Sequence, residues 1–305
     1  MGGFDMKQLG FFTIILWSLM LFQSPLKAQS SFVAGDRHLC WIGNTKKVRC
    51  IGDNSYGKVE SPQDLSFESL SASRNITCGL TTDEGRIKCW GEFSEARMRA
   101  LEELADINGY SVSYSHVCAW QAHGEVRCSG VDLYGEVVRG TIEHLNFMAL
   151  GPQLSCAFTT TGTHCSGFRA KQWATRLQDS EDWQQIRIGA HYSCGLRKNG
   201  QLKCWGNWRG EEDLGNSKAI PKPHQTKIRS FAIGQHHACA LDDMGELKCW
   251  GHDFQGAVTG WQKARENIPR SVRLKDVAVG DGFSCASYEH HRRICWGRPL
   301  EHQEK

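Results

Sequence analysis

The sequence predicts an all-β fold, a seven-bladed β-propeller of antiparallel sheets with one disulfide in each blade. Three observations support this prediction: a cysteine pair recurs seven times, a turn lies in the middle of most pairs, and the repeats fill almost all of the 305 residues. Together the pairs use all fourteen cysteines. The pairs are Cys40–Cys50, Cys78–Cys89, Cys118–Cys128, Cys156–Cys165, Cys194–Cys204, Cys239–Cys249 and Cys285–Cys295.

The spacing of the pairs indicates a repeat. Their first cysteines stand 38, 40, 38, 38, 45 and 46 residues apart, about 41 on average. Repeat periods of roughly 20 to 50 residues are typical of solenoids, propellers and arrays. A Gly follows two residues after every second cysteine, and in four units a Trp lies between them. These tryptophans are Trp90, Trp205, Trp250 and Trp296.

Each pair is expected to bridge the two strands of a hairpin. If Cys194 faces Cys204, the loop is the three residues 198–200, and its last residue is Gly200. Three-residue hairpin loops favour a glycine with positive φ at this place. The same arithmetic puts Gly124 and Gly245 third in their loops, and Gly85 last in a four-residue loop. A pair of opposed residues without mutual backbone hydrogen bonds brings the sulfurs within bonding distance.

The rest of each unit completes a small sheet. A short apolar stretch such as 186–189 or 277–280 precedes each hairpin, and a turn such as 53–57 or 252–256 follows it. Three to four short strands per unit, without a long helical period, predict one antiparallel sheet per repeat. Closing seven sheets into a ring protects their edges, which is the arrangement of a propeller.

Residues 1–28 are expected to be a signal peptide, and residues 29–305 the propeller. The apolar run 11–22 has the length of a signal-peptide core and is short for a membrane span, although an uncleaved anchor is the alternative. Lys7 supplies the positive flank, and cleavage is expected after Ala28. We therefore expect an exported protein, in the periplasm, at the cell surface or secreted, without a membrane span once the leader is removed.

Cysteine usage agrees with export, because seven local pairs suit an oxidising compartment. Zinc is the competing interpretation, but structural zinc sites favour cysteines two to four residues apart. We expect seven sequential disulfides and no metal or other cofactor. The formal charge of +3 gives no support for a nucleic-acid partner.

The repeat pattern resembles a known family. Gly-x-x-His-x-Cys, then x-x-x-Gly-x-x-x-Cys-Trp-Gly-x-Asn/Asp-x-x-Gly, is similar to the regulator of chromosome condensation repeat, in the cysteine-paired form of exported bacterial proteins. The resemblance covers about residues 32–299 and implies a seven-bladed β-propeller. The sequence departs from this pattern in unit four, which is short and has Ser166-Gly167 in place of Trp-Gly. The exchange activity that gave the family its name is not expected here. Secreted β-lactamase-inhibitory propellers, which bind through aromatic loops on one face, are the better analogy.

Histidines precede the first cysteine of several units. His38, His116 and His237 lie two residues before it, and His191 and His236 three before it. They could converge on a metal at the ring opening, but we favour packed residues that hydrogen-bond a neighbouring blade. The equivalent residues elsewhere form a mixture typical of packing, namely Ile76, Leu154, Tyr192 and Phe283.

Tryptophans outside the repeat position are the candidate binding residues. Trp173, Trp183, Trp208 and Trp261 lie in the segments between hairpins. Aromatic residues on loops are enriched where proteins bind partners. The alternative, which we favour slightly, is that they seal the packing between blades.

No nucleophile elbow, phosphate-binding loop or paired carboxylates point to catalysis. The leading hypothesis is an exported, monomeric, disulfide-stapled propeller that acts as a protein-binding module. A carbohydrate-binding or cell-envelope-binding propeller is the second hypothesis. An enzyme with a site at the ring centre is the third. We do not expect an enzyme.

Ring closure is the last expectation. The first unit begins soon after the leader, and only eight residues follow Gly297. We expect blade seven to lack strands or to take one from residues 30–34, with Phe32 and Val33 packed near Val277 and Val279.

Overall fold

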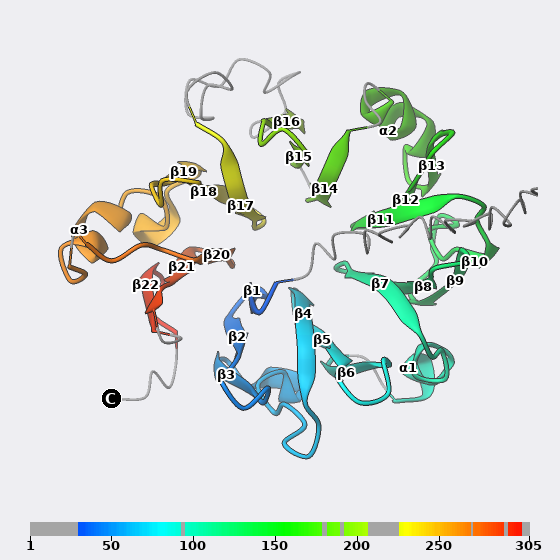
Figure 1. Cartoon of the computed structure of the whole chain (residues 1–305), viewed down its shortest axis with the longest axis horizontal. Helices are drawn as coiled ribbons and strands as arrows, with labels where there is room; N and C mark the ends of the chain where they lie inside the picture. The colour runs from blue at the N-terminus through cyan, green and yellow to red at the C-terminus, as the bar shows by residue number, and fades with distance from the viewer. Residues whose placement is uncertain are drawn as a thin grey trace, which may run out of the picture.

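The computed structural model describes residues 30–92, 95–178, 182–189, 192–206, 226–269, 271–289 and 292–300. Seven antiparallel sheets form a ring, with the first strand of each sheet innermost (Figure 1). Within each sheet, strands that follow one another in sequence are hydrogen-bonded neighbours. This arrangement confirms the predicted seven-bladed propeller.

The blades are numbered in chain order. Blades 1 and 2 contain β1 (Phe32–Ala34), β2 (His38–Ile42), β3 (Val48–Gly52), β4 (Phe67–Ser73), β5 (Ile76–Thr81) and β6 (Ile87–Gly91). Blade 3 contains β7 (Ile107–Val112), β8 (His116–Gln121), β9 (Glu125–Gly130) and β10 (Arg139–Thr141). Blades 4 and 5 contain β11 (Leu145–Gly151), β12 (Leu154–Thr159), β13 (Gly162–Gly167), β14 (Trp183–Ile188), β15 (Tyr192–Arg197) and β16 (Leu202–Gly206). Blades 6 and 7 contain β17 (Ile228–Ile233), β18 (His237–Asp242), β19 (Leu247–Gly251), β20 (Asp276–Val279), β21 (Phe283–Ser287) and β22 (Arg293–Gly297).

The hairpins form as predicted. Cys194 lies directly opposite Cys204, and the six other pairs have the same register. All seven disulfides join cysteines within one blade, with Cα atoms 4.0 to 4.2 Å apart. Gly85, Gly124, Gly200 and Gly245 all have positive φ, between 58° and 88°. The cysteine spacing therefore determines both the register of each hairpin and its turn.

Short helices take the outer position of three blades, where the sequence pattern predicted only extended chain. They are α1 (Glu95–Glu102), α2 (Ala170–Leu177) and α3 (Trp261–Arg265), and two 3₁₀ turns cover Ser55–Gly57 and Phe254–Gly256. The helices pack on β9, β13 and β22, respectively. With eight residues at most, they are too short to show a clear helical period, although α1 and α2 consist largely of good helix formers.

The hydrophobic core consists of seven separate clusters, one at each interface between neighbouring blades. The repeat tryptophans contribute to it and are 5–8% exposed. Two of them also donate an indole N–H to a carbonyl of the preceding blade's outer loop, Trp90 to Lys58 at 3.1 Å and Trp296 to Ala257 at 2.8 Å. Each blade is thus held by its two neighbours, and the stability of the ring depends on closure.

Closure differs from the expectation. β1 pairs with β2 and belongs to blade 1, and blade 7 has three strands, like five of the other blades. Ring closure instead relies on side-chain packing and hydrogen bonds without a shared strand: Phe32 packs in one cluster with Ala278 and Phe283 of blade 7. The Ser30 Oγ donates to Asp276 Oδ2 at 2.5 Å, and the backbone N–H of Asp281 donates to the Asp36 carbonyl at 2.7 Å.

The expected packing of Phe32 and Val33 near Val277 and Val279 was wrong for a simple reason. Neighbouring residues of a strand point to opposite faces of the sheet. Phe32 therefore faces blade 7, whereas Val33 faces blade 2 and packs with Phe67 and Leu70. Val277 and Val279 face blade 6 instead. β1 consequently contributes to two blade interfaces at once.

In the described parts of the chain, no helix has the length and apolar character needed to cross a membrane.

Candidate functional site

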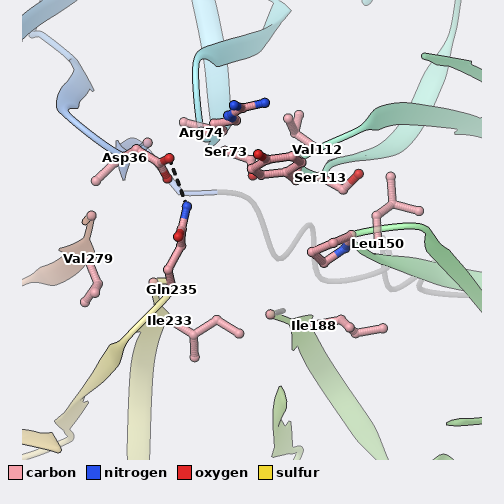
Figure 2. A pocket seen from close by; sticks show the side chains of 18 residues that line it. Asp36, Ser73, Arg74, Val112, Ser113, Leu150, Ile188, Ile233, Gln235 and Val279 are labelled. Atoms are coloured by element: carbon pink, nitrogen blue, oxygen red, sulfur yellow. Dashed lines mark hydrogen bonds between the residues drawn. The ribbon is translucent and has the colours of Figure 1, made fainter. Parts of the chain in front are cut away.

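A cavity of about 310 Å³, the central channel of the ring, has its mouth where the innermost strands end on one side. Every blade contributes to its lining, so the cavity exists only in the closed ring (Figure 2). We call this side of the ring the pocket face. The opposite side, which carries the turns between the second and third strands, is called the hairpin face.

An aliphatic collar surrounds the cavity. It is formed by the residue six positions before the first cysteine of every unit, namely Ala34, Ala72, Val112, Leu150, Ile188, Ile233 and Val279. Figure 2 shows the larger of these side chains around the opening. Because alanines occupy the least volume, the collar leaves the most room beside blades 1 and 2.

Polar residues form a rim above this collar. Asp36 and Gln235 come from blades 1 and 6 and meet above blade 7, where Gln235 Nε2 donates to Asp36 Oδ2 at 2.9 Å (Figure 2). On the neighbouring part of the rim, the Arg74 guanidinium lies 4.1 Å from the centre of the Tyr114 ring. Arg74 is also 3.8 Å from a carboxylate oxygen of Glu92.

Asp36 has an unusual environment for a carboxylate at the mouth of a cavity. Burial is the main cause that raises its pKa, and nearby Asp281 acts in the same direction. The Gln235 hydrogen bond and the more distant charges of Arg74 and Lys58 lower that pKa. Asp281 differs, because Arg298 donates to its carboxylate at 2.9 Å. Among the described residues, no cationic group lies within ion-pair distance of Asp36.

The loops after the third strands also lie on the pocket face. In six blades, the backbone N–H that follows the glycine ending the third strand donates to a carbonyl between the first and second strands, at 2.7–3.0 Å. The donors are Asp53, Glu92, Val131, Phe168, His252 and Arg298. This repeated hydrogen bond holds the outer loop of each blade against the inner turn.

The exposed large hydrophobic residues are concentrated on this face. Seven are found in the described part of the chain, and six of them belong to the inner turns and outer loops of the pocket face. These six are Tyr56, Tyr114, Leu133, Tyr134, Phe168 and Phe254. The seventh, Met244, lies in a hairpin turn on the opposite side.

Three further contacts involve these aromatic residues. The rings of Tyr134 and Phe168 come from the outer loops of blades 3 and 4 and lie 5.3 Å apart. Arginines accompany two rings, with Arg169 5.1 Å from Phe168 and Arg298 5.2 Å from Phe254. Exposed aromatic and arginine side chains are the types most enriched at the energetic centres of protein interfaces.

The three histidines two residues before a first cysteine connect neighbouring blades. The Nε2 atoms of His38, His116 and His237 lie 2.7 Å from a hydroxyl of the next blade. The hydroxyls belong to Thr77, Ser155 and Ser284. This geometry confirms that the three histidines are packed residues that hydrogen-bond a neighbouring blade.

The hydrogen bonds of two serine hydroxyls show which ring nitrogen of His116 and His237 carries the proton. Ser155 Oγ donates to the Glu136 carbonyl at 2.6 Å, and Ser284 Oγ donates to the Ala257 carbonyl at 3.1 Å. Because each hydroxyl has a single proton, the Nε2–H of His116 and His237 must be the donor. Burial is the main cause that lowers the pKa of both to about 4, and it lowers that of His38 to about 3.

The two other histidines of this pattern differ. His236 is exposed, 3.9 Å from Asp281, and His191 lies outside the described residues. Within the described parts of the chain, no group of three His, Cys, Asp or Glu side chains has metal-binding geometry.

The tryptophans considered as binding residues lie mostly in the blade packing. Trp183 is 5% exposed and packs edge-on against Trp205, with ring centres 5.2 Å apart. Trp173 and Trp261 are half-buried and pack against the clusters between blades 4 and 5 and between blades 6 and 7. Trp208 lies outside the described residues. Contact of Trp173 or Trp261 with a partner stays a prediction.

The sequence contains a signal for the collar that the sequence analysis did not use. Counting six residues back from each first cysteine gives only Ala, Val, Leu and Ile. Counting four back gives the mixed set of rim residues, including Asp36, Arg74, Tyr114 and Gln235. Aligning the units on their cysteines would therefore have separated lining from rim.

Fold, disulfides and channel define the chain as a disulfide-stapled seven-bladed β-propeller. Residues 228–257, which cover most of blade 6, match the family model described as the regulator of chromosome condensation (RCC1) repeat. The match confirms the resemblance for this unit, and the common register of the seven cysteine pairs shows that the other units share its plan.

Solved structures support the same fold. The CRINKLY WD40 ectodomain of the Arabidopsis thaliana receptor kinase ACR4 is similar with a TM-score of 0.65 at 20% identity, over 90% of this chain and 96% of that one. The Physcomitrella patens receptor kinase CR4 ectodomain gives a TM-score of 0.64 at 22% identity, over 88% and 73% of the two chains. Prp20p from Saccharomyces cerevisiae, described with binding to Gsp1p and histones, gives 0.61 at 16% identity, over 90% and 83%. These similarities establish the fold.

Proposed function

We propose that this protein is an exported interaction module that binds a protein partner through its pocket face. The seven disulfides support an oxidising, exported environment, and the leader expected over residues 1–28 agrees with it. On this proposal the mature chain, residues 29–305, acts as a monomer and without catalysis.

The observation that carries the proposal is the concentration of exposed large hydrophobic side chains on one face. Six of the seven found among the described residues lie in the inner turns and outer loops of the pocket face, and one of them, Tyr114, lines the cavity. Apolar side chains that gather on one face and are bordered by polar residues mark interaction sites, whereas singly exposed ones do not. The structural neighbours include receptor ectodomains and a protein that binds Gsp1p and histones, which supports a role in binding over catalysis.

Site-specific photo-crosslinking tests the proposal. A photoreactive amino acid replaces Tyr134 or Phe168 on the pocket face, and in a matched control it replaces Met244 on the hairpin face, which is more exposed than either. The purified mature variants are incubated with periplasmic or culture extracts of the native host. We expect discrete protein adducts from the two pocket-face positions and none from the control.

Equal adducts from all three positions, or adducts from Met244 alone, would contradict the proposal. Carbohydrate binding would replace protein binding if the chain bound a glycan array and this binding disappeared in Tyr134→Ser and Phe168→Ser but not in Met244→Ser.

A further inference from the structure

We propose that the channel mouth binds one apolar side chain of the partner, with a lysine or arginine within two residues of it that pairs with Asp36. The inference rests on the proposed function and specifies the chemistry of the partner segment at the centre of the pocket face.

The cavity fits the apolar part of this segment. Its volume is about 310 Å³, and its collar consists of seven aliphatic side chains. An apolar cavity of about 150 Å³ already holds benzene, so this one has room for a leucine, phenylalanine or tryptophan side chain. The cavity is preformed because the collar belongs to the innermost strands, which the disulfide-linked hairpins and blade packing hold in place. An anchor entering a preformed cavity loses little free energy to reorganisation.

The rim fits the basic part. Asp36 stands at the wide side of the collar, two residues after Ala34 and level with Arg74, which itself follows Ala72 by two residues. Arg74 is engaged by Tyr114 and Glu92, and Asp281 by Arg298, whereas the side-chain partner of Asp36 is the neutral amide of Gln235. An incoming cation thus finds one half-buried carboxylate without an ion-pair partner among the described residues. Asp36 prefers a cation to an acidic group by simple charge complementarity.

The position of Asp36 above the cavity explains why the apolar residue and the basic residue of the partner must be close in sequence. The Asp36 carboxylate lies above the collar, and Figure 2 shows it at the edge of the opening with Gln235 reaching up to it. A side chain that fills the cavity from the pocket face therefore places its own backbone next to Asp36. Only residues close in sequence to the anchor can bring a cationic group to that carboxylate, because consecutive residues of an extended segment advance by about 3.3 Å.

Selection from a random peptide library tests the inference. The probe is a displayed library of random dodecamers, selected on the oxidised mature chain, and the dissociation constants of the enriched peptides are then measured in solution. We expect an enriched pattern of one large apolar residue with Lys or Arg within two positions. The variant Ala72→Phe, which fills the wide side of the cavity, should weaken these peptides at least about tenfold.

A double-mutant cycle tests the ion pair separately. Asp36→Asn keeps the shape of the side chain and should weaken the basic peptides about fivefold, as expected for a half-exposed ion pair. The same change should have no effect on peptides in which the basic residue is replaced by Gln. Because Asp36→Asn is nearly isosteric, this arm remains informative even if Ala72→Phe disturbs the fold, which thermal unfolding and circular dichroism would reveal.

Each of the remaining outcomes overturns the inference in a recognisable way. Peptides that depend on Tyr134 and Phe168 but tolerate Ala72→Phe and Asp36→Asn would leave the proposed function standing and the inference wrong. Peptides that are sensitive only to Met244→Ala would contradict both. A selection without any enriched sequence would also count against the inference, since a preformed apolar cavity should select anchors from a random library.

Discussion

The blade interfaces and the pocket face use aromatic side chains in opposite ways. At the interfaces, Trp90 and Trp296 are buried, and their indole N–H groups donate to carbonyls of the preceding blade. On the pocket face, Tyr134 and Phe168 contact each other while 51% and 45% of their surfaces stay exposed. Only the first group belongs to the hydrophobic clusters between blades. The second group is therefore free to serve binding, and substitutions in the two regions should separate stability from function.

The strongest test of this difference removes β1. Phe32 and Val33 face different neighbours, so deletion of residues 29–36 damages two interfaces as well as one strand. We expect the free energy of unfolding to fall by more than about 5 kcal/mol, from the burial of two apolar side chains and the lost cavity filling. The thermal midpoint under oxidising conditions should fall by on the order of 10 °C.

Ser31→Ala is the matched control, because Ser31 is exposed beside β1 and should leave the midpoint unchanged. An unaltered midpoint in the deletion variant would mean that blade 7 closes the ring without Phe32.

The buried histidines give a test of intermediate size. Because burial lowers the pKa of His237 to about 4 from an ordinary value of 6.5, the neutral form stabilises the folded state. Its contribution is complete above pH 6.5 and is lost as the pH falls toward 4, since the unfolded chain binds the proton first. The loss at one histidine is roughly 3 kcal/mol. Urea unfolding at pH 7.5 and pH 4.5 measures it.

Asp53 contributes little to the loss in this pH window. The pKa of Asp53 is lowered chiefly by its hydrogen bond from Lys58, so its contribution is lost only below its ordinary value of 3.8. Asp36, whose pKa is raised, acts in the opposite sense. His237→Gln keeps a donor for Ser284 but cannot ionise, and it should remove the part of the pH dependence that His237 contributes, while the parts from His38 and His116 remain. A pH dependence that is identical in wild type and variant would show that His237 is not the cause.

The histidines and the tryptophans also show what the sequence could and could not predict. The register of the hairpins and the positive φ of Gly200 follow from local spacing, because a disulfide and a three-residue loop leave few alternatives. The His116 contact to the next blade was predictable from its position in the repeat. Such features are set within one unit or between equivalent positions of adjacent units.

Features that depend on several blades were harder to predict. Trp183 occurs in a variable segment, as a binding residue would, and only the strand register shows that it faces Trp205 in the packing between blades. The rim contact between Asp36 and Gln235 joins residues 199 positions apart, above a blade that neither belongs to. Which neighbouring blades the two faces of β1 contact depends on its pairing with β2. The cysteine spacing near the N-terminus did not indicate this pairing.

The smallest expected effect is on the pocket face. In Tyr134→Ser with Phe168→Ser, two described ring contacts are lost, the one between the two substituted residues and the one from Arg169 to Phe168. Neither ring belongs to a core cluster. Exposed substitutions of this kind usually change the free energy of unfolding by no more than about 0.5 kcal/mol. We therefore expect an unchanged urea midpoint in the double variant. Substitution of the buried Trp90 or Trp296 should, in contrast, lower the midpoint. Loss of more than about 2 kcal/mol would show that the aromatic pair helps to hold blades 3 and 4 together, and the division between packing and binding aromatic residues would not hold for this part of the ring.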